Sequence, residues 1–106
     1  MTPEQLRERA IEAYERDIAK KNITTAMESR MVVDYNGGVF IVTQELISFL
    51  NAWHDDLIYM LDAYDVPIRV QANVLLSKCK QRWREVMYEF AIEYKEYTAV
   101  RNAKQL

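Results

Sequence analysis

Met31-Val-Val-Asp-Tyr-Asn-Gly-Gly-Val-Phe-Ile-Val42 is the stretch that decides the fold. β-Branched and aromatic residues stand on both sides of Asn36-Gly37, the residue pair that most strongly indicates a two-residue hairpin turn. A β-hairpin is therefore expected over residues 31–42, with Val33 opposite Phe40. Successive residues of a strand face opposite sides, and Val32 with Ile41 is as apolar as Val33 with Phe40, so we expect both faces of this hairpin to need cover from helices or from another hairpin.

The residues before the hairpin predict a helix over residues 3–21. Thr2 can cap this helix, Pro3 suits its first position, and apolar residues recur at helical spacing as far as Ile18. Two lysines would lie in the last turn, where cations favour the carbonyl end of the helix dipole. Residues 22–30 carry signals for both strand and helix, so their structure stays open.

Two more helices are expected after the hairpin, over residues 44–64 and 68–100. Thr43 can cap the first, and a proline breaks the pattern between them. Apolar residues follow one another in steps of three and four, as in packed helices: Leu46, Leu50, Trp53, Leu57, Met60 and Tyr64, and then Leu76, Cys79, Trp83, Val86 and Phe90. The short connection predicts a long antiparallel, coiled-coil-like helical hairpin, with Trp53 and Trp83 on its facing seams.

Composition agrees with one mainly helical domain of the α+β class. The 106 residues are 50% hydrophobic and 28% charged, and only two glycines and two prolines are available for tight turns. Few turns argue against an all-β fold, and the length suits a single core. The expected architecture is a single domain of residues 1–106, in the order helix, β-hairpin and long helical hairpin.

The sequence favours a cytoplasmic location. No apolar run approaches the roughly 20 residues that cross a bilayer, and charged residues begin at Glu4, where a signal peptide would soon turn apolar. The single cysteine, Cys79, has no partner in the chain for a disulfide, which fits a reducing compartment. We expect Cys79 to be a small buried apolar residue of the third helix.

Groupings that could carry catalysis are weak. His54, the only histidine, would have to serve any Ser-His-Asp or Cys-His arrangement, and its place beside the helical seam favours a structural role. A stripe of acids on the third helix could serve a metal-dependent hydrolase, although such helical sites need matching acids from a second helix: Glu85, Glu89, Glu93 and Glu96. We therefore expect no catalytic residue, cofactor or metal site, and keep the hydrolase as a second alternative.

Charge is unevenly distributed along the chain. Residues 1–66 carry 6 basic and 12 acidic groups, whereas residues 67–106 carry 8 basic and 4 acidic groups. Part of the basic excess surrounds Trp83 in the third helix and could contact phosphates: Lys78, Lys80, Arg82 and Arg84. A sequence pI near 5.4 opposes this role, and the simpler interpretation is that these cations complement the acidic second helix. Nucleic-acid regulation is thus the first alternative function.

The leading interpretation is a non-catalytic protein-protein interaction or assembly protein, because apolar seams are abundant and catalytic groupings are not. The third helix would extend well beyond the second, and this overhang and the apolar hairpin would both need cover. We therefore expect a two-fold homodimer, in addition to an unidentified protein partner. The expected contact residues are Val33, Phe40, Phe90, Tyr94 and Tyr97. The alternative is a compact monomer in which the first helix covers both surfaces.

One part of the chain resembles a known group of proteins. Tyr35–Phe40, followed by Thr43 and by Glu45–Leu50, is similar to small uncharacterised proteins carried by marine T4-like phages of the cyanophage type. The resemblance spans residues 31–88 and includes no motif of known role, so no functional residue is transferred. It implies a small protein that binds during virion assembly or binds a host component, in the host cytoplasm.

Overall fold

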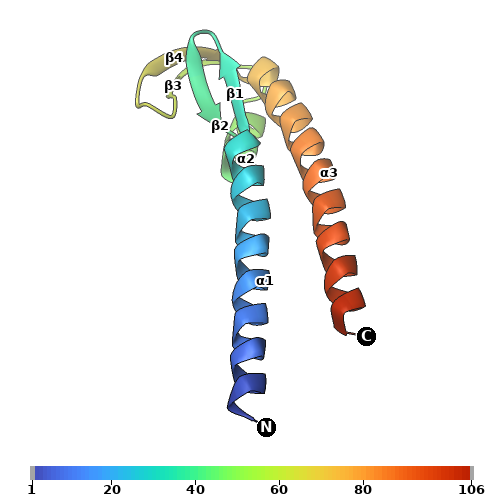
Figure 1. Cartoon of the computed structure of the whole chain (residues 1–106). Helices are drawn as coiled ribbons and strands as arrows, with labels where there is room; N and C mark the ends of the chain where they lie inside the picture. Colours follow the sequence, from blue (N-terminus) through green and yellow to red (C-terminus); the bar gives the residue numbers. More distant parts are fainter. Residues whose placement is uncertain (1, 106) are drawn as a thin grey trace.

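The computed structural model describes the backbone of residues 2–105 and the side chains of residues 2–99. The chain is of the predicted mainly helical α+β class, in the order helix, hairpin, helix, long C-terminal helix, with a second hairpin before the last helix (Figure 1). The elements are α1 (Pro3–Arg30), β1 (Val32–Tyr35), β2 (Gly38–Ile41), α2 (Gln44–Ala52), β3 (Leu57–Leu61), β4 (Pro67–Gln71) and α3 (Ala72–Gln105).

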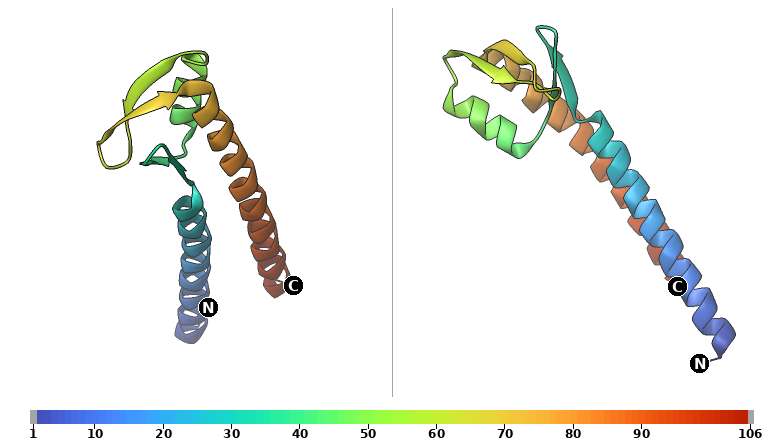
Figure 2. Two further views of the ribbon diagram at one scale, coloured as in Figure 1. Left: turned by 90° about the horizontal axis from the view of Figure 1, so that it is seen from above. Right: turned by 90° about the vertical axis from the view of Figure 1, so that its left-hand side faces the viewer.

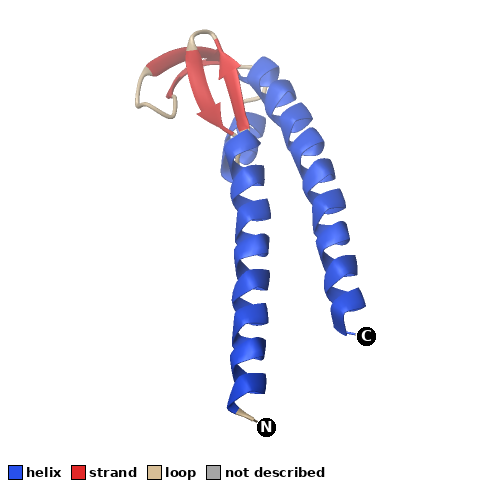
Figure 3. Cartoon of the chain, in the orientation of Figure 1, coloured by secondary structure: helices blue, strands red, loops and turns tan. Residues whose placement is uncertain are grey.

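The molecule has a head and two helical arms. The head, residues 31–86, holds all four strands, α2 and the first part of α3 (Figure 3). The arms are α1 and the part of α3 after Val86, which run side by side away from the head (Figure 1 and Figure 2). The extents are 65 × 24 × 20 Å and the radius of gyration is 19.8 Å. A compact chain of this length has a radius of gyration of about 13 Å, so the arms make the molecule strongly elongated.

The first hairpin forms as predicted. β1 and β2 are antiparallel with Val33 opposite Phe40, and Asn36 and Gly37 both have positive φ, at 48° and 81°, as a two-residue turn of this kind requires. Val33 and Phe40 are buried, whereas Ile41, which belongs to the other face, is 54% exposed. The expectation that both faces would need cover is therefore met on one face only.

The helix predicted over residues 44–64 is wrong in extent, because α2 ends at Ala52 and residues 57–61 form a strand. β3 pairs with β4 in a second antiparallel hairpin. Leu57, Met60 and Tyr64 have helical spacing, yet residues 57–61 also alternate as a strand does, and turn chemistry favours the strand. Two features of that turn support it: Asp65 has a φ of 59°, and the Asp62 carboxylate accepts the N–H groups of Tyr64 and Val66.

The helix predicted over residues 68–100 begins later, at Ala72, because Ile68 and Val70 alternate inward from β4. The second hairpin separates α2 from α3, so the short helical connection predicted between them is wrong. Trp53 is consequently off the predicted seam, as the 45% exposed C-cap of α2. Trp83 of α3 is partly buried against the core beside the first turns of α2, so the two tryptophans do not face each other as predicted.

The first helix is longer than the predicted 3–21 and takes in the open residues 22–30. Its start is as predicted, with Thr2 and Gln5 forming a reciprocal capping box. The helix continues through the polar residues near its C-terminal end. The Thr24 and Ser29 hydroxyls there donate to helix carbonyls one turn earlier, so both side chains are satisfied within the helix. No residue of α1 is buried.

The core lies where the two hairpins and α2 pack on the first part of α3. Leu50 of α2, Val70 of β4 and Leu75 of α3 are fully buried there. Asp62, 9% exposed, joins the hairpins, since its carboxylate also accepts the Val39 N–H at 3.1 Å. These backbone hydrogen bonds hold the pKa of Asp62 below its usual value.

Candidate functional site

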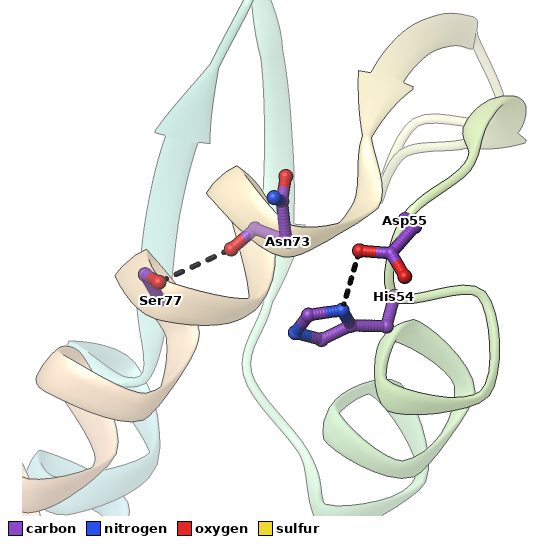
Figure 4. A network of polar contacts seen from close by, with 4 residues as sticks. All are labelled: His54, Asp55, Asn73 and Ser77. Atoms are coloured by element: carbon purple, nitrogen blue, oxygen red, sulfur yellow. Dashed lines mark hydrogen bonds and ion pairs between the residues drawn. The ribbon is translucent and has the colours of Figure 1, made fainter.

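The single histidine lies in a small polar network at the end of α2 (Figure 4). His54 Nδ1 lies 2.9 Å from Asp55 Oδ1, and both side chains are largely exposed. The nearby Ser77 hydroxyl donates to the Asn73 carbonyl at 3.1 Å. Within the described residues no hydrogen bond joins His54 to Ser77, so the histidine and the serine do not form the hydrogen-bonded pair that a Ser-His-Asp nucleophile requires.

The cysteine is placed as the sequence predicted. Cys79 is fully buried in the head, and burial raises the pKa of its thiol to about 11. Since the thiolate is the reactive form, Cys79 is inert near neutral pH and contributes to packing.

The glutamate stripe of α3 faces α1, where one member has a partner. Glu89 forms an ion pair with Arg30 at the end of α1, and this contact lowers the pKa of the Glu89 carboxyl. Glu85 and Glu93 lie near the same guanidinium. Over the described residues no cluster of three metal-ligating side chains occurs. The cation beside these glutamates is therefore Arg30 of α1, and their contact links the two arms.

Three of the four basic residues of α3 line hollows beside its junction with α2. Lys80 and Arg84 line one hollow, and Lys78 and Lys80 line a second. Lys78 also reaches the first hairpin, with Nζ 5.7 Å from the Tyr35 ring centroid and 3.4 Å from the Asp34 carbonyl. Arg82, the fourth cation of the predicted patch, lines neither hollow.

The groove lies along the junction of α2 with the first part of α3. One hollow of about 570 Å³ is lined by Gln44, Ile47, Ser48, Lys80, Trp83 and Arg84. Lys80 also lines a second hollow of about 530 Å³, which reaches His54 and the start of α3. Neither hollow has an aspartate or glutamate in its lining. The groove is hence a local basic surface on an acidic chain, and no single sequence motif indicated it.

The predicted self-association residues fall into two groups. Val33 and Phe40 are buried in the head of the same chain, so they offer no free surface. Phe90, Tyr94 and Tyr97 form a row of aromatic rings on the α3 arm, with neighbouring ring centroids 5.9 and 6.0 Å apart. This row is only partly covered, since Tyr94 remains 39% exposed.

Both arms also expose apolar side chains that the sequence analysis did not single out. On α1, Ile11, Tyr14 and Ile18 follow one another in steps of three and four residues and are 39–67% exposed. On α3, Tyr88 and Ile92 are four residues apart and 70% and 43% exposed. Side chains at such spacing share one helix face, the pattern of a helix that packs on another element.

No family model, curated protein or solved structure matches the chain. Within the described residues no helix is both long enough and apolar enough to cross a bilayer.

Proposed function

We propose that this protein is a non-catalytic assembly protein that works as a homodimer, with the helical arms as its contact surface. The observation that carries the proposal is α1, a helix of 28 residues with no buried residue. Isolated helices gain most of their stability from packing of an apolar face. A second copy supplies the packing that α1 lacks.

The exposed area supports a partner of this size. The chain exposes 8000 Å², whereas a compact monomer of 12.6 kDa exposes about 6,200 Å². The excess of about 1,800 Å² exceeds the roughly 800 Å² that each partner contributes to a standard interface. The excess is therefore large enough for one standard interface.

The polar contacts between the arms are few and exposed. Arg30 and Glu89 pair near the head, and both side chains are nearly half exposed, so this ion pair contributes little to stability. Farther out, the Tyr97 hydroxyl donates to the Arg16 carbonyl at 3.0 Å. The apolar residues on the other faces of the arms have no partner in the described chain, and two-fold pairing of the arms would cover them.

Light scattering of the intact chain at micromolar concentration tests the proposal. We expect a mass near twice 12.6 kDa, and a mass near 12.6 kDa for Ile11→Asp with Ile18→Asp, because burying two charges would disrupt the interface. The control is Leu57→Asp with Leu61→Asp on β3, whose side chains are 50% and 58% exposed, against 50% and 39% for Ile11 and Ile18. These changes should leave the dimer intact.

Two results would contradict the proposal. One is a mass near 12.6 kDa for the unchanged protein at every concentration. The other is a dimer that the β3 changes dissociate and the α1 changes do not, which would place the interface on the head.

The resemblance to small phage proteins agrees with a role in assembly or in binding a host component. Two observations are consistent with non-catalytic action. Burial raises the pKa of the Cys79 thiol, and the Ser77 hydroxyl donates to the Asn73 carbonyl and not to His54. The metal-dependent hydrolase receives no support from the glutamate stripe, whose Glu89 pairs with Arg30.

A further inference from the structure

We infer that the groove between α2 and α3 binds single-stranded nucleic acid, with Lys80 and Arg84 on the phosphates and Trp83 against a base. This inference does not depend on the dimer, because the groove belongs to the head and the proposed interface to the arms.

The charge of the groove is the first reason. Lys80 and Arg84 form no ion pair with any described side chain, and no carboxylate lines either hollow. Among the described lysines and arginines only Arg30 forms an ion pair, so what distinguishes the groove is a lining with cations and no carboxylate. Such a surface attracts anions even when the whole molecule carries a net charge of −2.

The neutral lining of the groove is the second reason. The Gln44 amide and the Ser48 hydroxyl face the cations from α2 and make no hydrogen bond within the described chain. Amides and hydroxyls are, with Arg and Lys, the side chains that contact phosphate and sugar oxygens. Trp83 lies between Lys80 and Arg84 in the sequence and lines the same hollow. The groove therefore combines phosphate ligands with an aromatic surface, the pair of features by which single strands are bound.

The shape of the groove selects a single strand over a duplex. Proteins that read duplex DNA insert a protruding helix or β-ribbon into the major groove, whereas Lys80, Trp83 and Arg84 line a hollow between two packed helices. The lining of the two hollows extends along α3 from Asn73 to Arg84, or about 16 Å at 1.5 Å per residue. This length suits a few nucleotides of an extended strand.

Fluorescence of Trp83 reports directly on the groove. In a Trp53→Phe background Trp83 is the only tryptophan of the chain. Titration with an oligothymidylate of twelve nucleotides at 50 mM salt should quench its emission in a saturable manner. Lys80→Gln with Arg84→Gln should weaken binding more than about tenfold, and should lower the slope of log affinity against log salt by about 1.4, or about 0.7 for each lost phosphate contact.

Lys20→Gln with Lys21→Gln on α1 is the matched control, because it removes the same charge from a helix that lines neither hollow. We expect this variant to bind with nearly unchanged affinity and salt slope. Melting curves of both double variants establish that each is folded.

Several outcomes would overturn the inference. Absence of oligothymidylate binding at 50 mM salt is one, and equal loss of binding in the α3 and α1 double variants is another, since it would indicate a general effect of charge. Equal quenching by polyglutamate would assign the groove to acidic polypeptides. Tighter binding of a duplex of the same length, without a change in Trp83 emission, would exclude the stacked single strand.

Discussion

The head is richer in apolar residues than the arms, and the two regions use them differently. In the head, residues far apart in sequence meet in one core, and Leu50, Val70 and Leu75 are completely buried. In the arms, α1 buries no residue and the described part of α3 beyond Val86 buries none either. One helix, α3, therefore contributes both to the core and to the exposed surface that we propose a second copy covers.

The largest expected difference concerns truncation of apolar residues in the two regions. Leu75→Ala in the head should lower the free energy of unfolding by about 2–5 kcal/mol, the usual cost of a cavity at a fully buried leucine. Ile18→Ala on α1 should change the unfolding of the dilute monomer by less than about 0.5 kcal/mol, because Ile18 is 39% exposed there. Urea denaturation followed by circular dichroism measures both values.

An Ile18→Ala loss as large as that of Leu75→Ala, at a concentration where the protein is monomeric, would show that the arms are stabilised within one chain. The distinction between head and arms would then fail.

A smaller effect is expected from the carboxylate that joins the two hairpins. The pKa of Asp62 is lowered in the folded state because its carboxylate accepts backbone N–H groups from Val39, Tyr64 and Val66. Its contribution to stability is therefore fully present above the unfolded pKa of about 3.9, and is lost as the pH falls through the lower folded pKa. Melting temperature measured from pH 7 to pH 2 should fall on the acid side, and Asp62→Asn should reduce that fall.

If the melting temperature of Asp62→Asn fell in acid by as much as that of the unchanged protein, the pH dependence would belong to other carboxylates. Glu89→Gln is the matched control in the arms, where the Arg30 contact lowers the pKa of an exposed carboxyl. Its effect should be smaller than that of Asp62→Asn, because exposed ion pairs are screened by solvent.

The sequence predicted the elements whose local signals agree with their surroundings. Asn36-Gly37 between apolar strands, the Thr2 and Thr43 caps, and buried Cys79 were all identified correctly. The second hairpin was missed because Leu57–Leu61 is a short, wholly apolar run, which fits a helical segment as well as a strand. The signal that distinguishes them is Asp62 with Asp65, an acceptor side chain followed by a residue in the left-handed conformation.

The sites were harder to predict than the elements because each depends on how helices pack. Lys78 and Lys80 line one hollow together, yet Lys78 also contacts the first hairpin and Lys80 the junction with α2, which the sequence alone does not indicate. The groove itself required the position of α2. The exposed face of α1 could have been read from Ile11, Tyr14 and Ile18, whose spacing of three and four residues indicates a packed face.

Amide hydrogen exchange, followed segment by segment over a range of protein concentrations, tests the central claim most directly. We expect protection in the head, including β1–β2 and the first turns of α3, to be independent of concentration, because its core is internal. Protection along α1 should rise with concentration, in step with the light-scattering mass, as a second copy covers it. Strong protection of α1 in samples diluted until the mass is 12.6 kDa would contradict the account.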